Sequence, residues 1–160
     1  MDACMISLFQ NSIEIYDYLC QPVCKKYDIQ QTSLNILLFL ANNPGFNTAK
    51  DIHKYRGIKQ SMVSFHVEKL VRDGYIERES VPEDRRQVKL VCTKKAQALI
   101  EEGRRQQELF MRCISEDVTE EDREAYIKVL SILKRNIMNC IELKLQGSLD
   151  EHIQMFMEAE

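Results

Sequence analysis

Glycine and proline are scarce in this chain, which has only five glycines and three prolines in 160 residues. Because these residues mark most turns and helix ends, their scarcity favours long helices and argues against a turn-rich all-β fold. No apolar run approaches the roughly 20 residues that a membrane-spanning helix needs. The chain begins with Asp2 close to its start and lacks the basic segment of a secretory signal, so we expect a cytoplasmic protein that does not enter a membrane.

The motifs of catalysis and metal binding are also missing. There is no phosphate-binding glycine loop, no nucleophile elbow, and neither a CxxC nor an HExxH pattern. The three histidines, His53, His66 and His152, are scattered along the chain. The six cysteines do not reach the density of a disulfide scaffold, so we expect reduced thiols. The sequence therefore predicts neither an enzyme nor a metal or cofactor site.

Acidic residues outnumber basic ones overall, but the charges are unevenly distributed. The net charge is −3, whereas residues 50–95 hold 12 Lys and Arg against 7 Asp and Glu, a local excess of +5. The rest of the chain has 10 basic and 18 acidic residues, which gives −8. Because charges act over only ~10 Å at physiological salt, the basic middle of the chain is able to face a phosphate backbone.

Apolar periodicity and helix-capping patterns predict a mainly α chain. Pro22 is expected to kink or end the first helix, and Thr32 is the expected N-cap of the second. Thr48 precedes Asp51 by three residues, which is the spacing of a capping box, and Thr119 begins the same kind of pattern. The expected helices cover residues 4–20, 32–42, 48–56, 59–72, 93–114 (capped by Thr93) and 119–141.

Between residues 48 and 93 the pattern changes from helix–turn–helix to a strand hairpin. In the helix over residues 59–72 the expected core stripe is Val63, Val67 and Leu70, and the opposite face is largely polar. Short hydroxyl and amide side chains near a helix N-terminus suit phosphates and base edges in a major groove. An ordinary solvated face would have the same composition. The candidate DNA-contacting residues are Lys59, Gln60 (toward adenine), Ser61, Ser64, Phe65 (toward a thymine methyl) and Lys69.

Two segments of alternating polarity follow, residues 75–80 and 87–92, as expected for a half-exposed hairpin. Its tip contains Asp84, Arg85 and Arg86. Arginine is attracted to the concentrated negative potential of a narrow minor groove, and a nearby aspartate orients its guanidinium group. The competing interpretation is a polar turn kept soluble by its charges. Together with the preceding helix, the hairpin indicates a winged helix-turn-helix that reads duplex DNA.

This order of elements resembles the MarR family of bacterial transcription regulators. The resemblance is carried by the SxxS of Ser61 and Ser64, by LVRDGYIER before the first strand, and by Asp84-x-Arg86 at the hairpin tip. It implies that Arg86 enters the minor groove, that Asp84 steadies it, and that the two serines read the major groove. Phe65 stands where many members have a basic residue, so the operator sequence is expected to differ from common ones.

The resemblance covers residues 8–142 and also implies partners and control. Members of the family form dimers through their N- and C-terminal helices, bind palindromic operators, and repress until a small ligand or oxidation releases them. We therefore expect a homodimeric repressor of mainly α fold with a small β-hairpin wing. The alternative is a winged-helix module that binds protein instead of DNA, although Arg85, Arg86 and Lys89 argue against it. The expected division is an N-terminal dimerisation region at 1–31, a DNA-binding lobe at 32–92, and C-terminal dimerisation helices with a tail at 93–160.

The same resemblance places an effector site where the dimer helices meet the DNA-binding lobe. A small aromatic or apolar effector is expected there, although core packing would explain the same side chains. The candidate residues are Ile13, Tyr16, Cys20, Leu37 and Leu109.

Two cysteines are candidates for a thiol switch. Cys20 and Cys24 flank Pro22, and the neighbouring Lys25 and Lys26 would lower a thiol pKa and so favour the reactive thiolate. The competing interpretation is that both are small buried apolar side chains.

Overall fold

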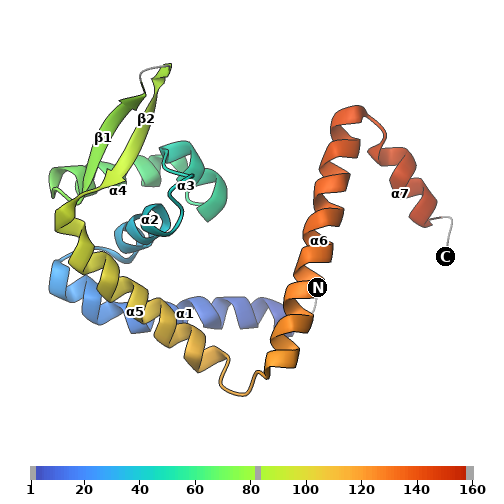
Figure 1. Ribbon diagram of the computed structural model, residues 1–160, viewed down its shortest axis with the longest axis horizontal. Helices are drawn as coiled ribbons and strands as arrows, with labels where there is room; N and C mark the ends of the chain where they lie inside the picture. The colour runs from blue at the N-terminus through green and yellow to red at the C-terminus, as the bar shows by residue number, and fades with distance from the viewer. Residues whose placement is uncertain (1–2, 82–83, 158–160) are drawn as a thin grey trace. The chain divides into compact units, whose positions relative to one another are not determined.

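The computed structural model describes residues 3–81 and 84–157, apart from the side chains of residues 3–6, 9, 81 and 84–87. Contacts divide the chain into two units, Met1–Ile114 and Ser115–Glu160 (Figure 1). The first unit contains α1 (Ala3–Tyr27), α2 (Gln31–Asn42), α3 (Ala49–Arg56), α4 (Gln60–Arg72), β1 (Ile76–Val81), β2 (Asp84–Cys92), the 3-10 turn η1 (Lys94–Ala96) and α5 (Gln97–Ile114). The second contains α6 (Glu120–Gln146) and α7 (Leu149–Met157).

The core of the first unit is built around α2, whose sequence supplies almost continuous apolar side chains. Leu34, Ile36, Leu37 and Leu38 are buried, and burying each contributes about 1.5–3 kcal/mol. Helices α1, α4 and α5 all pack against α2. Gly103 allows α5 to come close, because a Cβ at this position would lie only 2.9 Å from Cδ2 of Leu38.

Both capping boxes predicted from the sequence are confirmed. Oγ1 of Thr48 accepts a hydrogen bond from the N–H of Asp51 at 3.1 Å, and the Asp51 carboxylate accepts one from the N–H of Thr48 at 3.0 Å. Thr119 and Asp122 make the same reciprocal pair. Each box satisfies two of the N–H groups that a helix start leaves unpaired. Helices α3 and α6 therefore begin where the local sequence predicts.

Of the two alternatives expected at Pro22, a kink or an end of the first helix, the end is wrong, because α1 continues through this proline to Tyr27. Proline in a helix interior removes a backbone donor and crowds the preceding turn, at a cost of about 3 kcal/mol. Contacts on both sides offset this cost. Cys20 and Val23 are buried in the core, and the hydroxyl of Tyr27 donates a hydrogen bond of 2.9 Å to Glu102 of α5.

Two expected N-caps are also wrong. Helix α2 begins at Gln31 without a side-chain cap, so Thr32 lies inside its first turn. Thr93 does not cap α5 with its side chain. Its hydroxyl donates to the carbonyl oxygen of Gly74 at 2.8 Å and its N–H donates to that of Tyr75 at 3.0 Å. The hydroxyl and the N–H of Thr93 are thus both bonded at the base of the hairpin. The 3-10 turn η1 follows Thr93, and α5 starts only after it, at Gln97.

The second unit has no buried residue among those that the structure describes. Gly147, in the left-handed conformation with φ 77°, separates α6 from α7. Large apolar side chains are exposed along most of α6, with many at three- and four-residue spacings that favour a helix face covered by a partner. These residues are Tyr126, Ile127, Val129, Leu130, Ile132, Leu133, Ile137, Met138, Ile141 and Leu145.

Candidate nucleic-acid interface

The joint between α3 and α4 determines how α4 is presented. Gly57 ends α3 in the left-handed conformation (φ 65°), which strains other residues, and its N–H donates to the carbonyl oxygen of His53 at 3.1 Å. Nδ1 of His53 lies 2.7 Å from the carbonyl oxygen of Ile58, so the residue after the turn is also tied to α3. This short, bonded connection is that of a helix-turn-helix.

Helix α4 has one face in the core and one face free. Val63, Val67 and Leu70 are buried, as predicted. The first turn of α4 carries no acidic residue, so the partial positive charge of the helix N-terminus is available to a phosphate. Among the candidate DNA-contacting residues, Lys59, Gln60, Ser61, Ser64 and Phe65 are exposed, and Lys69 is half-buried.

Two of the exposed polar side chains on α4, those of Ser64 and Glu68, have partners within the chain. The hydroxyl of Ser64 donates to the carbonyl oxygen of Gln60 at 3.0 Å. The guanidinium group of Arg78 on β1 donates to the carboxylate of Glu68 at 2.6 Å, and this bond lowers the pKa of Glu68. Because Arg78 compensates its charge, Glu68 opposes an approaching phosphate backbone less than a free carboxylate would.

One buried polar contact of α4, the one between His66 and Ser33, was not predicted from the sequence. His66 is 2% exposed, and its Nδ1 lies 2.9 Å from Oγ of Ser33 on α2. Its Nε2 has no hydrogen-bond partner among the described residues. Burial lowers the pKa of His66, and the charge of Lys69 adds to the effect. The spacing from Val63 to His66 to Leu70 places this histidine in the buried stripe of α4.

Acidification is expected to destabilise the fold through His66. Because its folded-state pKa lies below the unfolded value, the unfolded chain takes up the proton first as the pH falls. The stabilisation is complete above the unfolded pKa of about 6.5 and is lost as the pH falls toward the folded pKa. Urea unfolding between about pH 7 and pH 5 measures this loss. His66→Gln should reduce the pH dependence of the free energy of unfolding, whereas His53→Gln, at an exposed position, should leave it unchanged. An unchanged pH dependence in His66→Gln would contradict the assignment of this loss of stability to His66.

The hairpin is anchored to the lobe at its base and projects from it (Figure 1). Ile76 and Leu90 are buried, and the N–H of Leu90 donates to the carbonyl oxygen of Asn47 at 2.8 Å. The antiparallel pairing runs from Ile76 at the base to Val81 opposite Asp84. The backbones of Asp84, Arg85 and Arg86 therefore lie at the far end of β2, while their side chains lie outside the described residues.

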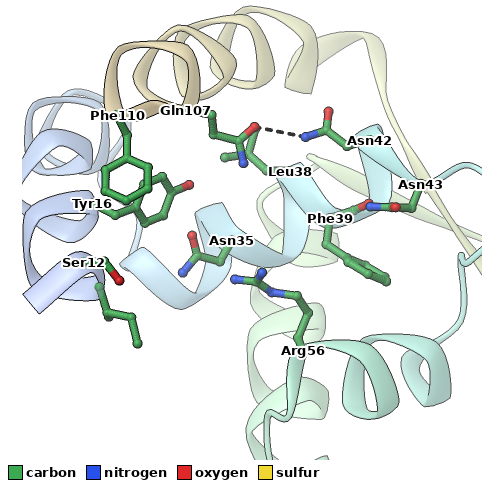
Figure 2. Close-up of a pocket in the computed structure, with 11 residues that line it drawn as sticks. Ser12, Tyr16, Asn35, Leu38, Phe39, Asn42, Asn43, Arg56, Gln107 and Phe110 are labelled. Atoms are coloured by element: carbon green, nitrogen blue, oxygen red, sulfur yellow. Dashed lines mark hydrogen bonds between the residues drawn. The ribbon is translucent and has the colours of Figure 1, made fainter. Parts of the chain in front are cut away.

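A cavity of about 310 Å³ lies among α1, α2, α3 and α5 (Figure 2). Among the expected effector residues, Ile13 and Tyr16 line the cavity. Cys20 and Leu37 are buried in the core instead, and Leu109 is half-buried outside the lining. The sequence thus predicted the lining residues Ile13 and Tyr16 of α1, whereas the residues expected from α2 and α5, Leu37 and Leu109, are not those that line the cavity.

The polar lining of the cavity contains one charged side chain. Arg56 extends from the last turn of α3, and Figure 2 shows its guanidinium group directed toward Asn35. Burial raises the pKa of Tyr16, with a smaller contribution from Cys20, so its hydroxyl stays neutral. The ring of Tyr16 lies edge-on to that of Phe110, with centroids 5.5 Å apart. The cavity therefore offers a cation, neutral polar groups and aromatic rings.

The surroundings of Cys20 and Cys24 disfavour the thiolate form. Burial raises the pKa of both thiols, and that of Cys24 reaches about 11 with a smaller contribution from Cys20. The Cys24 thiol donates to Oε1 of Gln31 at 3.3 Å. Lys25 and Lys26 therefore do not produce the lowered thiol pKa that was expected of a redox switch.

Within residues 3–81 and 84–157, no three or more His, Cys, Asp or Glu side chains gather in a way that would hold a metal ion. In the same part of the chain, no helix combines the length and the apolar character that crossing a membrane requires.

Comparison with known protein sequences identifies relatives of this chain. Residues 27–87, which include α2, α3, α4 and most of the hairpin, match the sequence profile of the MarR family. An uncharacterized HTH-type transcriptional regulator of Bacillus subtilis, YdgJ, is 29% identical over 111 residues, which are 69% of this chain and 67% of that protein.

Solved structures share the fold. A protein from Listeria monocytogenes, described as a MarR family transcriptional regulator and solved with a 26mer DNA, has a TM-score of 0.72 at 16% identity, covering 92% of this chain and 97% of that one. BpsR of Bordetella bronchiseptica, whose DNA binding is regulated by 6-hydroxynicotinic acid, has a TM-score of 0.59 at 20% identity, covering 80% and 91%. Residues 27–87 therefore match the MarR family, and the winged helix-turn-helix lobe has the fold of MarR family transcription regulators.

Proposed function

We propose that this regulator is a homodimeric repressor that binds a palindromic operator in duplex DNA. The observation that carries the proposal is the free face of α4, which exposes polar side chains at its N-terminal end. The hairpin beside it carries Arg85 and Arg86 in β2, next to the tip. A helix of this kind fits a major groove, and arginines at a hairpin tip suit the adjacent minor groove. The protein from Listeria monocytogenes, which has a similar fold, is complexed with a 26mer DNA.

The exposed apolar side chains of α6 support the homodimer. A two-fold interface buries the same patch on both copies, so the α6 residues of one copy would cover those of the other. Two copies related by a two-fold axis also present two α4 helices, and a palindromic operator has the matching symmetry.

Selection from a random duplex library, followed by fluorescence anisotropy on the enriched sequence, tests this function. We expect a palindrome to be enriched, because the two α4 helices would read equivalent half-sites. We also expect the affinity to fall by about 10³–10⁵ between about 50 and 200 mM salt if about 6–10 phosphates are contacted. Enrichment of no sequence, with DNA binding that ignores salt, would instead favour the winged-helix module that binds protein.

Release by a small aromatic carboxylate is proposed for the cavity beside α3. The guanidinium group of Arg56 would pair with the carboxylate, and the rings of Tyr16 and Phe110 would pack against the aromatic body. Arg56 is the residue immediately before Gly57, so a ligand held by Arg56 would act on the joint that presents α4. The cavity volume of about 310 Å³ suits a small ligand. BpsR, of similar fold, is regulated by an aromatic acid, 6-hydroxynicotinic acid.

Arg56→Gln is expected to weaken binding of aromatic carboxylates about 10- to 150-fold, because one charge-assisted hydrogen bond contributes about 1.5–3 kcal/mol. Calorimetry with benzoate and 6-hydroxynicotinic acid, each compared with its carboxamide, measures the effect. The wild type should prefer the acids, and Arg56→Gln should bind acids and amides alike. Lys54→Gln, which removes an exposed charge from the same helix, is the control. Equal binding of acids and amides by the wild type would contradict the proposed role of Arg56.

A further inference from the structure

Two large apolar side chains are exposed on the α4 face that the proposed function directs toward DNA. Met62 is 45% exposed and Phe65 is 58% exposed. They are three residues apart in the helix, so they are neighbours on its surface. Met62 directly follows Ser61 and Phe65 directly follows Ser64, so both lie beside exposed residues that are expected to meet base edges. Their exposure leaves apolar area to be covered by a partner.

The ring of Phe65 contacts a side chain that is itself held in place. It lies edge-on to the ring of His66, with centroids 5.2 Å apart and an interplanar angle of 84°. His66 is itself buried and lies 2.9 Å from Oγ of Ser33. Because its neighbour is fixed by packing and hydrogen bonding, Phe65 loses little freedom when it meets a partner surface.

The polar side chains beside this pair are partly engaged within the protein. The hydroxyl of Ser64 donates to the carbonyl oxygen of Gln60, and the carboxylate of Glu68 is paired with Arg78. Both groups are therefore less available to base edges than their exposure suggests. Recognition of DNA by this face of α4 therefore depends more on its exposed apolar side chains.

The major groove offers one apolar group to such side chains, the C5-methyl of thymine. We propose that Met62 and Phe65 select thymine by packing against its C5-methyl groups in the major groove. This specificity rests on the proposed DNA-binding function of α4. Duplex DNA is the occupant because the same face begins with the exposed Lys59 and the positive end of the helix. A methyl-bearing groove edged by phosphates complements both the apolar pair and the cation.

Replacement of thymine by deoxyuridine in the selected operator tests the proposal, because the two bases differ only by the C5-methyl group. Each contacted methyl that is removed should lower the affinity of the wild type about fourfold, the value for burial of one methyl-sized group. Phe65→Ala and Met62→Ala should each lose sensitivity to deoxyuridine at their own positions. Phe65→Leu retains an apolar contact and should remain sensitive. Lys59→Ala is the control, which should bind both operators more weakly by the same factor.

The outcomes separate this specificity from the proposed function. Equal affinity of the wild type for thymine and deoxyuridine operators, with sequence-selective and salt-dependent binding preserved, overturns the thymine proposal and leaves the repressor intact. A selected operator without thymine at its enriched positions overturns it as well. If the wild type binds no duplex sequence in preference to others, the proposed repressor function itself is overturned. Because Phe65 is exposed, the Phe65→Ala variant should have the same melting temperature as the wild type and should bind random DNA with the same affinity.

Discussion

Replacing Leu130 and Leu133 of α6 with aspartate is expected to give a monomer that binds the operator about 10²–10⁴-fold more weakly. Both leucines are exposed in the single chain, by 44% and 50%, on a helix without a buried residue. Charges at these positions would have to be buried in a two-fold interface without partners, which prevents association. A monomer contacts one half-site and loses the gain from joining two binding units. Sedimentation measures the association state, and fluorescence anisotropy measures the affinity.

The matched control places the same new residue elsewhere on the same helix. Lys128 is exposed and lies on the polar side of α6, close to Ser131 and Arg135. Lys128→Asp should sediment as a dimer and bind the operator with nearly unchanged affinity. A Leu130→Asp, Leu133→Asp double variant that still forms dimers would show that α6 is not the interface. A monomer with undiminished operator affinity would remove the dimer from the mechanism.

Replacing Arg86 with alanine is expected to weaken operator binding by about 1–3 kcal/mol, which corresponds to roughly 5- to 150-fold. The hairpin carries Arg86 near the far end of β2, and a guanidinium group in a narrow minor groove gains from the concentrated negative potential there. The salt dependence should also become shallower by about 0.9 in the slope of log affinity against log salt, for one phosphate neutralisation lost. Fluorescence anisotropy at several salt concentrations measures both quantities.

Arg85→Ala is the control for charge, because it removes the same positive charge from the adjacent residue. It should reduce the affinity less than Arg86→Ala does. Equal losses for the two variants would assign the effect to general charge rather than to an inserted Arg86. Wild-type affinity in Arg86→Ala would exclude the hairpin tip from DNA binding.

The features predicted correctly from the sequence are those decided by residues close together in the chain. The capping boxes of Thr48 and Thr119 need only a residue three positions away. The buried stripe of α4 follows from helical spacing, as does the exposure of Ser61 on the opposite side. The two-stranded hairpin follows from alternation and from the turn residues between its strands.

The wrong predictions concern residues whose local preference was overridden by distant contacts. Pro22 does not end α1, because buried neighbours and a bond from Tyr27 to α5 hold the following turn. Thr93 has the sequence context of an N-cap, but its hydroxyl bonds to Gly74 across the hairpin base. Neither partner can be recognised from the adjacent sequence.

The candidate effector site was only half predictable for the same reason. Ile13 and Tyr16 share one face of α1, so their common orientation follows from helical periodicity. Arg56 joins them only because the fold brings the end of α3 to the cavity that residues of α1, α2 and α5 also line. The sequence alone therefore could not predict that the charge of Arg56, which gives the cavity its proposed preference for an acid, lies in this site.

Hydroxyl-radical footprinting on the selected operator tests most directly whether a two-fold dimer presents two copies of α4 to DNA. Two equivalent protected half-sites are predicted, related by the symmetry of the palindrome, with centres about 10 bp or a multiple of about 10 bp apart. A single protected segment without two-fold symmetry, bound as tightly as the whole operator, would contradict the account.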